Sequence, residues 1–82
     1  MRLQRTAHFT RAYGKAPKQI QRAFDKQAQL LLLNLHHPSL HAKKYSEAED
    51  KCQARVTKSW RFYFKIIGAT YVIEDIIPHP KK

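Results

Sequence analysis

The clearest hydrophobic pattern of this chain lies at residues 17–35. Apolar side chains recur there every three or four positions, at Ile20, Phe24, Ala28, Leu31 and Leu35. Gln, Lys and Arg fill much of the opposite side, so the segment is predicted to be an amphipathic helix with one face on a core. Pro17 suits the start of this helix, where its missing N–H is not needed. Asn34 and Pro38 indicate where it ends.

The residues before this helix predict a short strand and a short helix. Residues 2–9 alternate weakly, and their apolar members share one parity: Leu3, Ala7 and Phe9. This alternation predicts a first strand. Thr10 is a suitable N-cap for the short helix after it, because a threonine hydroxyl can accept a hydrogen bond from a free backbone N–H. The apolar residues at helical spacing there are Phe9, Ala12, Tyr13 and Ala16.

The second half of the chain changes from helical to strand-like spacing. Residues 51–57, 60–67 and 70–77 are predicted to be strands, separated by turns at Thr57–Ser59 and at Gly68-Ala69. The polar, acidic segment 36–50 is predicted to be a loop. One strand, two helices and three strands indicate a small α+β domain over residues 1–82, with both helices on one face of a mostly antiparallel sheet.

The most informative strand is the one that follows the turn at Thr57–Ser59. Its apolar residues share one face: Trp60, Phe62, Phe64 and Ile66. Its polar residues share the other face: Arg61, Tyr63 and Lys65. An antiparallel partner strand would place Arg55 beside Arg61. Cations held this close repel one another, so the arrangement predicts an anion, and arginine matches the bidentate geometry of phosphate.

The overall charge supports an anionic partner. Sixteen Lys and Arg residues oppose six Asp and Glu residues, which gives a net charge of +10 on 82 residues. This charge favours nucleic acid or an acidic protein, with salt-sensitive binding. No apolar run approaches the ~20 residues of a membrane span, and the N-terminus lacks the apolar core of a signal peptide. With one cysteine, Cys52, the chain is expected in the reducing cytoplasm.

The run Leu30–Leu33 is apolar on every side of the predicted helix. One side should cover the sheet. The other side is either a second core contact or an exposed patch for a partner.

The order of these elements and the residues in them resemble the RelE/ParE superfamily of small bacterial and archaeal toxins. The resemblance runs over almost the whole chain, from the helix that starts at Pro17 to the C-terminal segment. It rests on His37-Pro38-Ser39-Leu40, Lys43-Lys44, Arg55-Val56, Trp60-Arg61, Gly68 and Asp75-Ile76-Ile77-Pro78-His79-Pro80. The chain departs from the family at Tyr45–Asp50, an acidic glycine-free segment where relatives often have a Leu-x-Gly step.

This resemblance implies the toxin of a type II toxin–antitoxin system. RelE-like members are ribonucleases that cleave messenger RNA, generally on the ribosome, and thereby inhibit translation. The implied partners are an acidic antitoxin, mRNA and the ribosome, with operator DNA contacted only through the antitoxin. ParE-like members share the fold but inhibit DNA gyrase, and this non-catalytic activity is the alternative. A third possibility is a basic nucleic-acid-binding module without toxicity.

A ribonuclease that uses the 2′-hydroxyl of RNA as its nucleophile needs no metal or cofactor. It must remove a proton, stabilise charge on phosphoryl oxygens and protonate the leaving oxygen. Arg61 is the candidate for charge stabilisation, with a structural salt bridge to Glu74 or Asp75 as the alternative role. Arg55 is a further candidate catalytic residue, which would hold the phosphate. His79 is the candidate general acid, because histidine is the side chain that ordinarily titrates near neutrality.

Further residues are candidates for binding or for the general base. The predicted RNA or phosphate contacts are Lys43, Lys44, Lys58, Tyr63 and Lys65. The base stays open between two lysines, whose pKa clustered positive charge could lower, and two carboxylates: Lys43, Lys44, Glu47 and Glu49. No metal is expected, because the histidines of the loop lack zinc-site spacing: His36, His37 and His41. A strand cysteine such as Cys52 is usually a small core residue.

Overall fold

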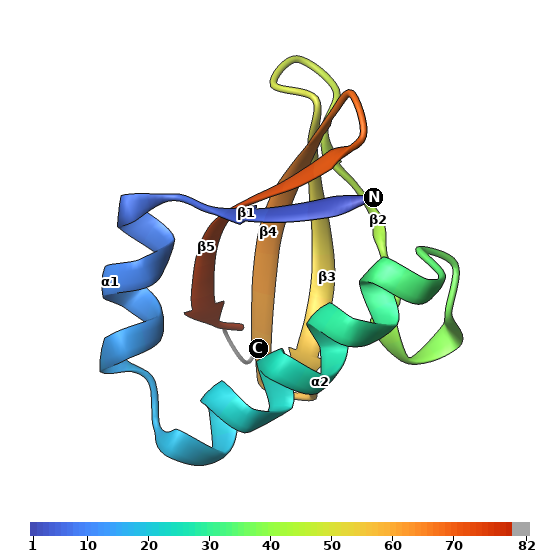
Figure 1. Ribbon diagram of the computed structural model, residues 1–82. Coiled ribbons are helices and arrows are strands. Elements are labelled where there is room, and N and C mark those ends of the chain that lie inside the picture. Colours follow the sequence, from blue (N-terminus) through green and yellow to red (C-terminus); the bar gives the residue numbers. More distant parts are fainter. Residues whose placement is uncertain (80–82) are drawn as a thin grey trace.

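The computed structural model describes residues 1–79, so Pro80 of the closing motif lies outside the described residues. The elements in chain order are β1 (Arg2–Arg5), α1 (Ala7–Lys15), α2 (Lys18–Leu33), a 3-10 turn (Pro38–Leu40), β2 (Lys43–Ser46), β3 (Lys51–Thr57), β4 (Trp60–Ile67) and β5 (Thr70–Pro78). Figure 1 shows β3, β4 and β5 as the centre of the molecule, with α1 and α2 around them.

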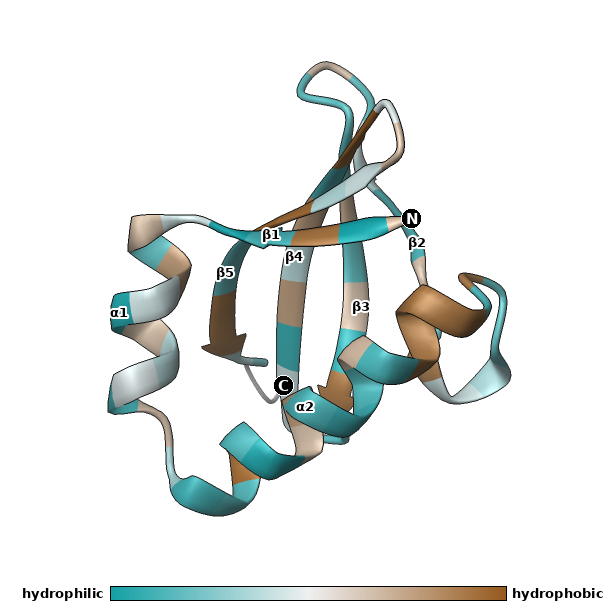
Figure 2. Ribbon diagram, viewed as in Figure 1, coloured by the Kyte–Doolittle hydropathy of each residue, from teal (hydrophilic) through white to brown (hydrophobic). Residues whose placement is uncertain are grey.

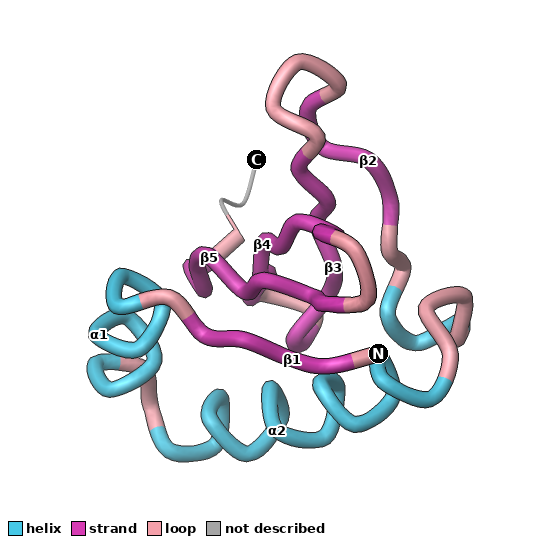
Figure 3. The backbone as a smooth tube through the Cα atoms, turned by 45° about the horizontal axis from the view of Figure 1, so that its top comes forward, coloured by secondary structure: helices cyan, strands magenta, loops and turns pink. Residues whose placement is uncertain are grey.

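The described strands form one sheet in the order β1-β5-β4-β3-β2. β1 runs parallel to β5, and every other neighbouring pair is antiparallel. Figure 3 shows both helices on the same side of this sheet. The predicted α+β class, with two helices on one face of a mostly antiparallel sheet, is therefore confirmed.

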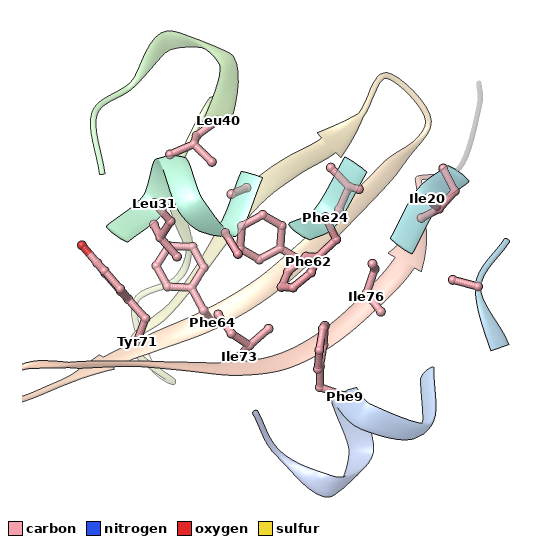
Figure 4. Close-up of a cluster of buried hydrophobic side chains, with 14 residues drawn as sticks. Phe9, Ile20, Phe24, Leu31, Leu40, Phe62, Phe64, Tyr71, Ile73 and Ile76 are labelled. Carbon is pink, nitrogen blue, oxygen red and sulfur yellow. The ribbon is translucent and has the colours of Figure 1, made fainter. Parts of the chain in front are cut away.

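Aromatic side chains form the contact between the helices and the sheet (Figure 4). The ring of Phe24 on α2 lies 4.9 Å from that of Phe9 on α1 and 5.1 Å from that of Phe62 on β4, measured between centroids. All three side chains are fully buried. The predicted apolar face of β4 is thus the buried face, although Ile66, near the end of the strand, is 37% exposed.

The first helix begins earlier than predicted, because Thr6 and not Thr10 is its N-cap. The Thr6 hydroxyl accepts a hydrogen bond from Phe9 N–H at 3.1 Å, while Thr6 N–H donates to Ile73 of β5 at 3.1 Å. Thr6 can do both because its backbone is still extended. The predicted strand 2–9 therefore ends at Arg5, and Phe9 reaches the core from a helix.

The predicted boundaries of α2 are confirmed to within about two residues, the usual uncertainty of helix ends. Pro17 occupies the N-cap position, and its carbonyl accepts hydrogen bonds from Ile20 and Gln21 N–H. At the other end Asn34 N–H donates to Leu30 O at 2.7 Å.

The prediction of a loop at residues 36–50 was wrong for seven of these residues, because Pro38–Leu40 and Lys43–Ser46 are regular elements, whereas 36–37, 41–42 and 47–50 are loop or turn. This segment contains the 3-10 turn and β2, which pairs with β3. β2 is a short edge strand, and three of its four residues are exposed. A strand with so little burial leaves no alternating pattern in the sequence, so β2 is defined by its pairing partner. In the following turn Asp50 takes a positive φ of 52°, a conformation that aspartate adopts more easily than most residues.

The Leu30–Leu33 run has one buried and one exposed side. Leu31 is 1% exposed and lies in the core, whereas Leu33 is 81% exposed. Figure 2 shows this last turn of α2 as a hydrophobic band. Within residues 1–79 no helix has the length and apolarity needed to cross a membrane.

Replacing Phe24 or Phe62 with alanine should lower the free energy of unfolding by ~3–5 kcal/mol, because each leaves a cavity between helix and sheet. Urea unfolding followed by circular dichroism measures this change. Leu33→Ala is the matched control and should shift stability by no more than about 0.5 kcal/mol, because its side chain is already exposed. Equal stability of all three variants would contradict the packing described.

Candidate active site

The sheet surface turned away from the helices, called the open face here, carries polar side chains in aligned rows. Strand register pairs Arg55 with Arg61, and Arg61 with Ile77. The next row on the same face is Lys43, Gln53, Tyr63 and Asp75. The predicted placement of Arg55 beside Arg61 across the hairpin is confirmed, and Arg61 and Tyr63 share a face because strand residues alternate.

A cleft of about 370 Å³ lies at one end of the open face. Its lining residues are His41, Ala42, Lys43, Gln53, Arg55, Arg61 and His79. They come from the segment before β2, from β2, β3 and β4, and from the residue after β5. The cleft thus gathers all three residues predicted to be catalytic, together with Lys43.

The turn between β3 and β4 holds the Arg61 side chain. Its Nη1 donates to the carbonyl of Thr57 at 2.8 Å and to that of Trp60 at 3.0 Å, with Lys58 O at 3.3 Å. Burial, followed by the like charge of Arg55, lowers the pKa of Arg61 from its ordinary value. Arginine nevertheless stays charged in proteins. The result is a fixed cation whose anchors are neutral carbonyls.

Within residues 1–79 neither Arg55 nor Arg61 forms an ion pair. The salt bridge considered for Arg61 is therefore not seen: Glu74 lies within 3.8 Å of two lysines, and Asp75 lies 3.2 Å from His8. Arg55 Nε is buried without a hydrogen-bond partner among these residues. A buried donor without a partner costs free energy. The cleft is suited to an anion because neither of its arginines has a carboxylate partner among residues 1–79.

His79 is positioned by its backbone. Its N–H donates to Ser59 O in the β3–β4 turn at 2.6 Å. This bond brings the end of the described chain to the same turn that anchors Arg61. The imidazole lines the cleft and is exposed to solvent, which suits a group that exchanges protons.

Sequence reasoning missed His41 and Gln53 as cleft residues. His41 follows the 3-10 turn with a left-handed backbone (φ 47°), which redirects the chain into β2. Its position two residues before Lys43 was the available clue. His37, two residues before Ser39, has a local role instead: its Nδ1 accepts a hydrogen bond from Ser39 N–H at 3.2 Å.

Lys44 lies outside the cleft and does not have the properties of a general base. It is paired with Cys52 in the row that faces the core, and its Nζ lies 2.5 Å from Asp50 Oδ1. This hydrogen bond raises the pKa of Lys44, so the expectation of a lowered pKa was wrong. Burial raises the pKa of the Cys52 thiol, as expected for an unreactive residue near the core.

The remaining predicted contacts surround the cleft without lining it. Lys58 is exposed in the turn, where its carbonyl helps to hold Arg61. Lys65 lies 3.8 Å from Glu74, whose negative charge partly compensates the charge of the lysine. Glu49, a candidate for the general base, lies 3.5 Å from Lys51. Tyr63 borders a neighbouring hollow on the open face.

A buried glutamine on the helix side of the sheet forms hydrogen bonds with two segments that line or precede the cleft. Gln27 of α2 is 6% exposed, and its Nε2 donates to Arg55 O at 2.9 Å and to Ser39 O at 3.1 Å. It thereby joins the helix, β3 and the 3-10 turn that leads to His41.

The sequence matches no protein-family model and no curated protein. The fold is similar to that of several solved structures. RelE in the archaeal RelE–RelB complex from Pyrococcus horikoshii OT3 matches with a TM-score of 0.81 at 16% identity, over 99% of this chain and 97% of that chain. The YoeB/ParE toxin from Agrobacterium tumefaciens matches with a TM-score of 0.80 at 12% identity, over 98% and 100%.

A third match is YafQ from E. coli strain BL21(DE3), with a TM-score of 0.77 at 18% identity, over 95% of this chain and 93% of that chain. The chain therefore has the fold of the RelE, YoeB and YafQ toxins, as the sequence predicted. At these identities the likeness is one of fold.

Gln27→Met should destabilise the protein by ~1–3 kcal/mol, because the carbonyls of Arg55 and Ser39 would lose their donor at nearly constant side-chain volume. Urea unfolding measures the change. Gln29→Met, on the exposed side of the same helix, is the matched control and should be close to neutral. A neutral Gln27→Met would show that the buried amide does not hold these elements together.

Proposed function

We propose that this protein is the toxin of a type II toxin–antitoxin system and that it cleaves mRNA without a metal ion. The observation that carries the proposal is the cleft that gathers Arg55, Arg61 and His79, in which neither arginine has a carboxylate partner among the described residues. The shared fold with RelE and YafQ supports it. The charge of +10 supports an RNA substrate.

In the proposed reaction the 2′-oxygen of a ribose attacks the adjacent phosphorus, and the bond from phosphorus to the 5′-oxygen breaks. The products are a 2′,3′-cyclic phosphate and a free 5′-hydroxyl. Negative charge grows on the phosphoryl oxygens in the transition state. Arg61 stabilises this charge through the guanidinium nitrogens that the turn does not engage, and Arg55 binds the phosphate through its guanidinium group in the cleft.

Two proton transfers complete the reaction. His79 gives a proton to the leaving 5′-oxygen, because its imidazole lies at the solvent-exposed rim of the cleft. The proton of the 2′-hydroxyl goes to a base in the cleft. His41 and Lys43 are the candidates, since both line the cleft, whereas Lys44 and Glu49 are engaged in ion pairs elsewhere.

The proposed partner is an acidic antitoxin that covers the basic open face and contacts the exposed leucines at the end of α2. Other proteins with this fold have been solved in complexes with antitoxins, including DinJ–YafQ from E. coli and RelB–RelE from Methanococcus jannaschii. The high positive charge and the 81% exposed Leu33 supply the electrostatic and apolar contacts that such a partner needs.

Arg61→Ala should lower the rate of mRNA cleavage on purified ribosomes by ~10²–10³, the usual cost of removing one preorganised group that stabilises charge. His79→Ala should lower the rate by ~10²–10⁴, as is typical for loss of an acid or base. Cleavage is measured by primer extension, and the cyclic phosphate and 5′-hydroxyl ends by end labelling. A chelator should have no effect.

Arg22→Ala is the matched control, because it removes the same charge from an exposed position on α2. Arg61→Lys tests geometry, since it retains the charge but loses the planar fork of donors. If folded Arg61→Ala and His79→Ala variants cut as fast as the parent, the site assignment is wrong. If the parent cuts no RNA but inhibits DNA gyrase, the ParE-like alternative replaces the nuclease.

Co-expression with the adjacent gene should relieve growth arrest and yield a stable complex, because an acidic partner would neutralise the open face. Growth curves and co-purification measure these effects. Leu33→Asp should weaken the complex, whereas Gln29→Asp, a nearby exposed change of equal charge, serves as the control. No toxicity of the protein alone, together with no co-purification, would contradict the proposal.

A further inference from the structure

A second hollow of about 170 Å³ lies on the open face beside the cleft. Its lining residues are Tyr45, Lys51, Tyr63, Asp75 and Ile77. Tyr63 follows Arg61 by two residues on β4, so the two side chains share a face about 7 Å apart along the strand. Ile77 is the register partner of Arg61 and forms the border between cleft and hollow.

Two tyrosines form an aromatic surface in this hollow. The rings of Tyr45 on β2 and Tyr63 on β4 lie 4.9 Å apart, edge to face, and Tyr45 is 58% exposed. Burial, with Tyr45 as the next cause, raises the pKa of Tyr63. The phenol therefore stays neutral and adds no negative charge to the surface that a nucleotide would contact. Exposed aromatic rings beside a cationic groove are the usual contact surface for unpaired bases.

A carboxylate reaches the hollow through an irregularity in β5. The register of β4 with β5 shifts between Tyr63 and Phe64, which leaves Glu74 unpaired and sets Asp75 opposite Tyr63. Such bulges redirect side chains. Asp75 Oδ1 accepts a hydrogen bond from Ile76 N–H at 2.8 Å and lies 3.2 Å from His8 Nε2. Within residues 1–79 its Oδ2 has no such partner and is left to accept from a ligand.

We propose that this hollow binds the unpaired RNA base next to the phosphate held in the cleft and that Asp75 selects a base with an exocyclic amino group. The inference rests on the proposed function, since it places this base relative to the scissile phosphate. Tyr45 and Tyr63 contact the ring of the base. Guanine, adenine and cytosine each offer an amino group to the carboxylate, and guanine adds a ring N–H beside its amino group. Uracil has no exocyclic amino group, and its single ring N–H on the pairing edge lies between two carbonyl oxygens, which a carboxylate repels.

The charges around the hollow favour a nucleotide over an acidic peptide. Among residues 1–79 Lys43, Arg55 and Arg61 of the cleft have no carboxylate partner, whereas Lys51 in the hollow already lies 3.5 Å from both Glu49 and Glu74. A phosphate is therefore directed to Arg55 and Arg61. The adjacent surface offers an aromatic face and an acceptor, the two contacts that a base uses.

The test uses binding, so that it does not depend on catalysis. The probes are fluorescent hexamers of 2′-O-methyl RNA, which lack the nucleophile and cannot be cut. One probe is all uridine and the other carries a single guanosine. Fluorescence anisotropy at low salt should show about 5- to 100-fold tighter binding of the guanosine probe, the range expected for a paired polar contact to a base.

Three variants assign the contacts. Asp75→Asn should reduce the preference for guanosine to less than about 3-fold, because the amide can also donate to uracil. Tyr63→Ala should weaken both probes about 5- to 100-fold through lost stacking, whereas Tyr63→Phe should bind like the parent. Asp25→Asn is the matched control, because the Asp25 carboxylate lies within 3.1 Å of the Tyr13 hydroxyl, away from the open face. This variant should keep the preference of the parent for the guanosine probe.

The outcomes separate this inference from the proposed function. Loss of the preference in Asp75→Asn supports the base site, whether or not the parent cleaves RNA. If RNA is cut but the parent shows no preference, or if the preference survives in Asp75→Asn, the base site is overturned and the nuclease stands. If the parent neither binds the probes nor cuts RNA, both fail.

Discussion

The pairing register of β3 with β4 decides which side chains enter the core and which reach the open face. Arg55 is opposite Arg61 in this register, and Ala54 is opposite Phe62. Side chains alternate along both strands, so a slip of one residue would turn the arginines toward α2 and expose the phenylalanines. The aromatic contacts of Phe62 with Phe24 oppose that slip, because they would be lost. Core packing thereby fixes the positions of the cations.

The pairing of Arg55 with Arg61 lowers the stability of the fold locally. Like charges directly opposite one another on neighbouring strands are destabilising. The carboxylates that could relieve this cost are placed elsewhere: Asp50 lies beside Lys44, and Glu74 beside Lys51 and Lys65. An anion in the cleft would remove part of the repulsion between Arg55 and Arg61. Binding of such an anion would therefore also stabilise the native state by mass action.

The hydrophobic periodicity of the sequence was sufficient to predict α2 and the β3–β4 hairpin, because the buried residues of both recur at the period of a helix or of a strand. It failed for β2, whose strand conformation comes from pairing rather than from burial. The N-cap at Thr6 was missed because Leu3 and Phe9 share a parity by coincidence, the first in a strand and the second in a helix. His41 reaches the cleft because its backbone is left-handed, and hydrophobic periodicity does not predict such a conformation.

The distribution of charge on the open face links the two proposed sites. Glu74 lies within 3.8 Å of Lys51 and Lys65 at one end of this face, whereas Arg55 and Arg61 have no carboxylate partner among residues 1–79. In the proposed complex these arginines bind a backbone phosphate, and an RNA strand that crosses the sheet then places its next base one row away. Tyr63 and Asp75 lie at that location because the register and the bulge of β5 put them one row from Arg61. Phosphate position and base selection therefore depend on the same two strand pairings.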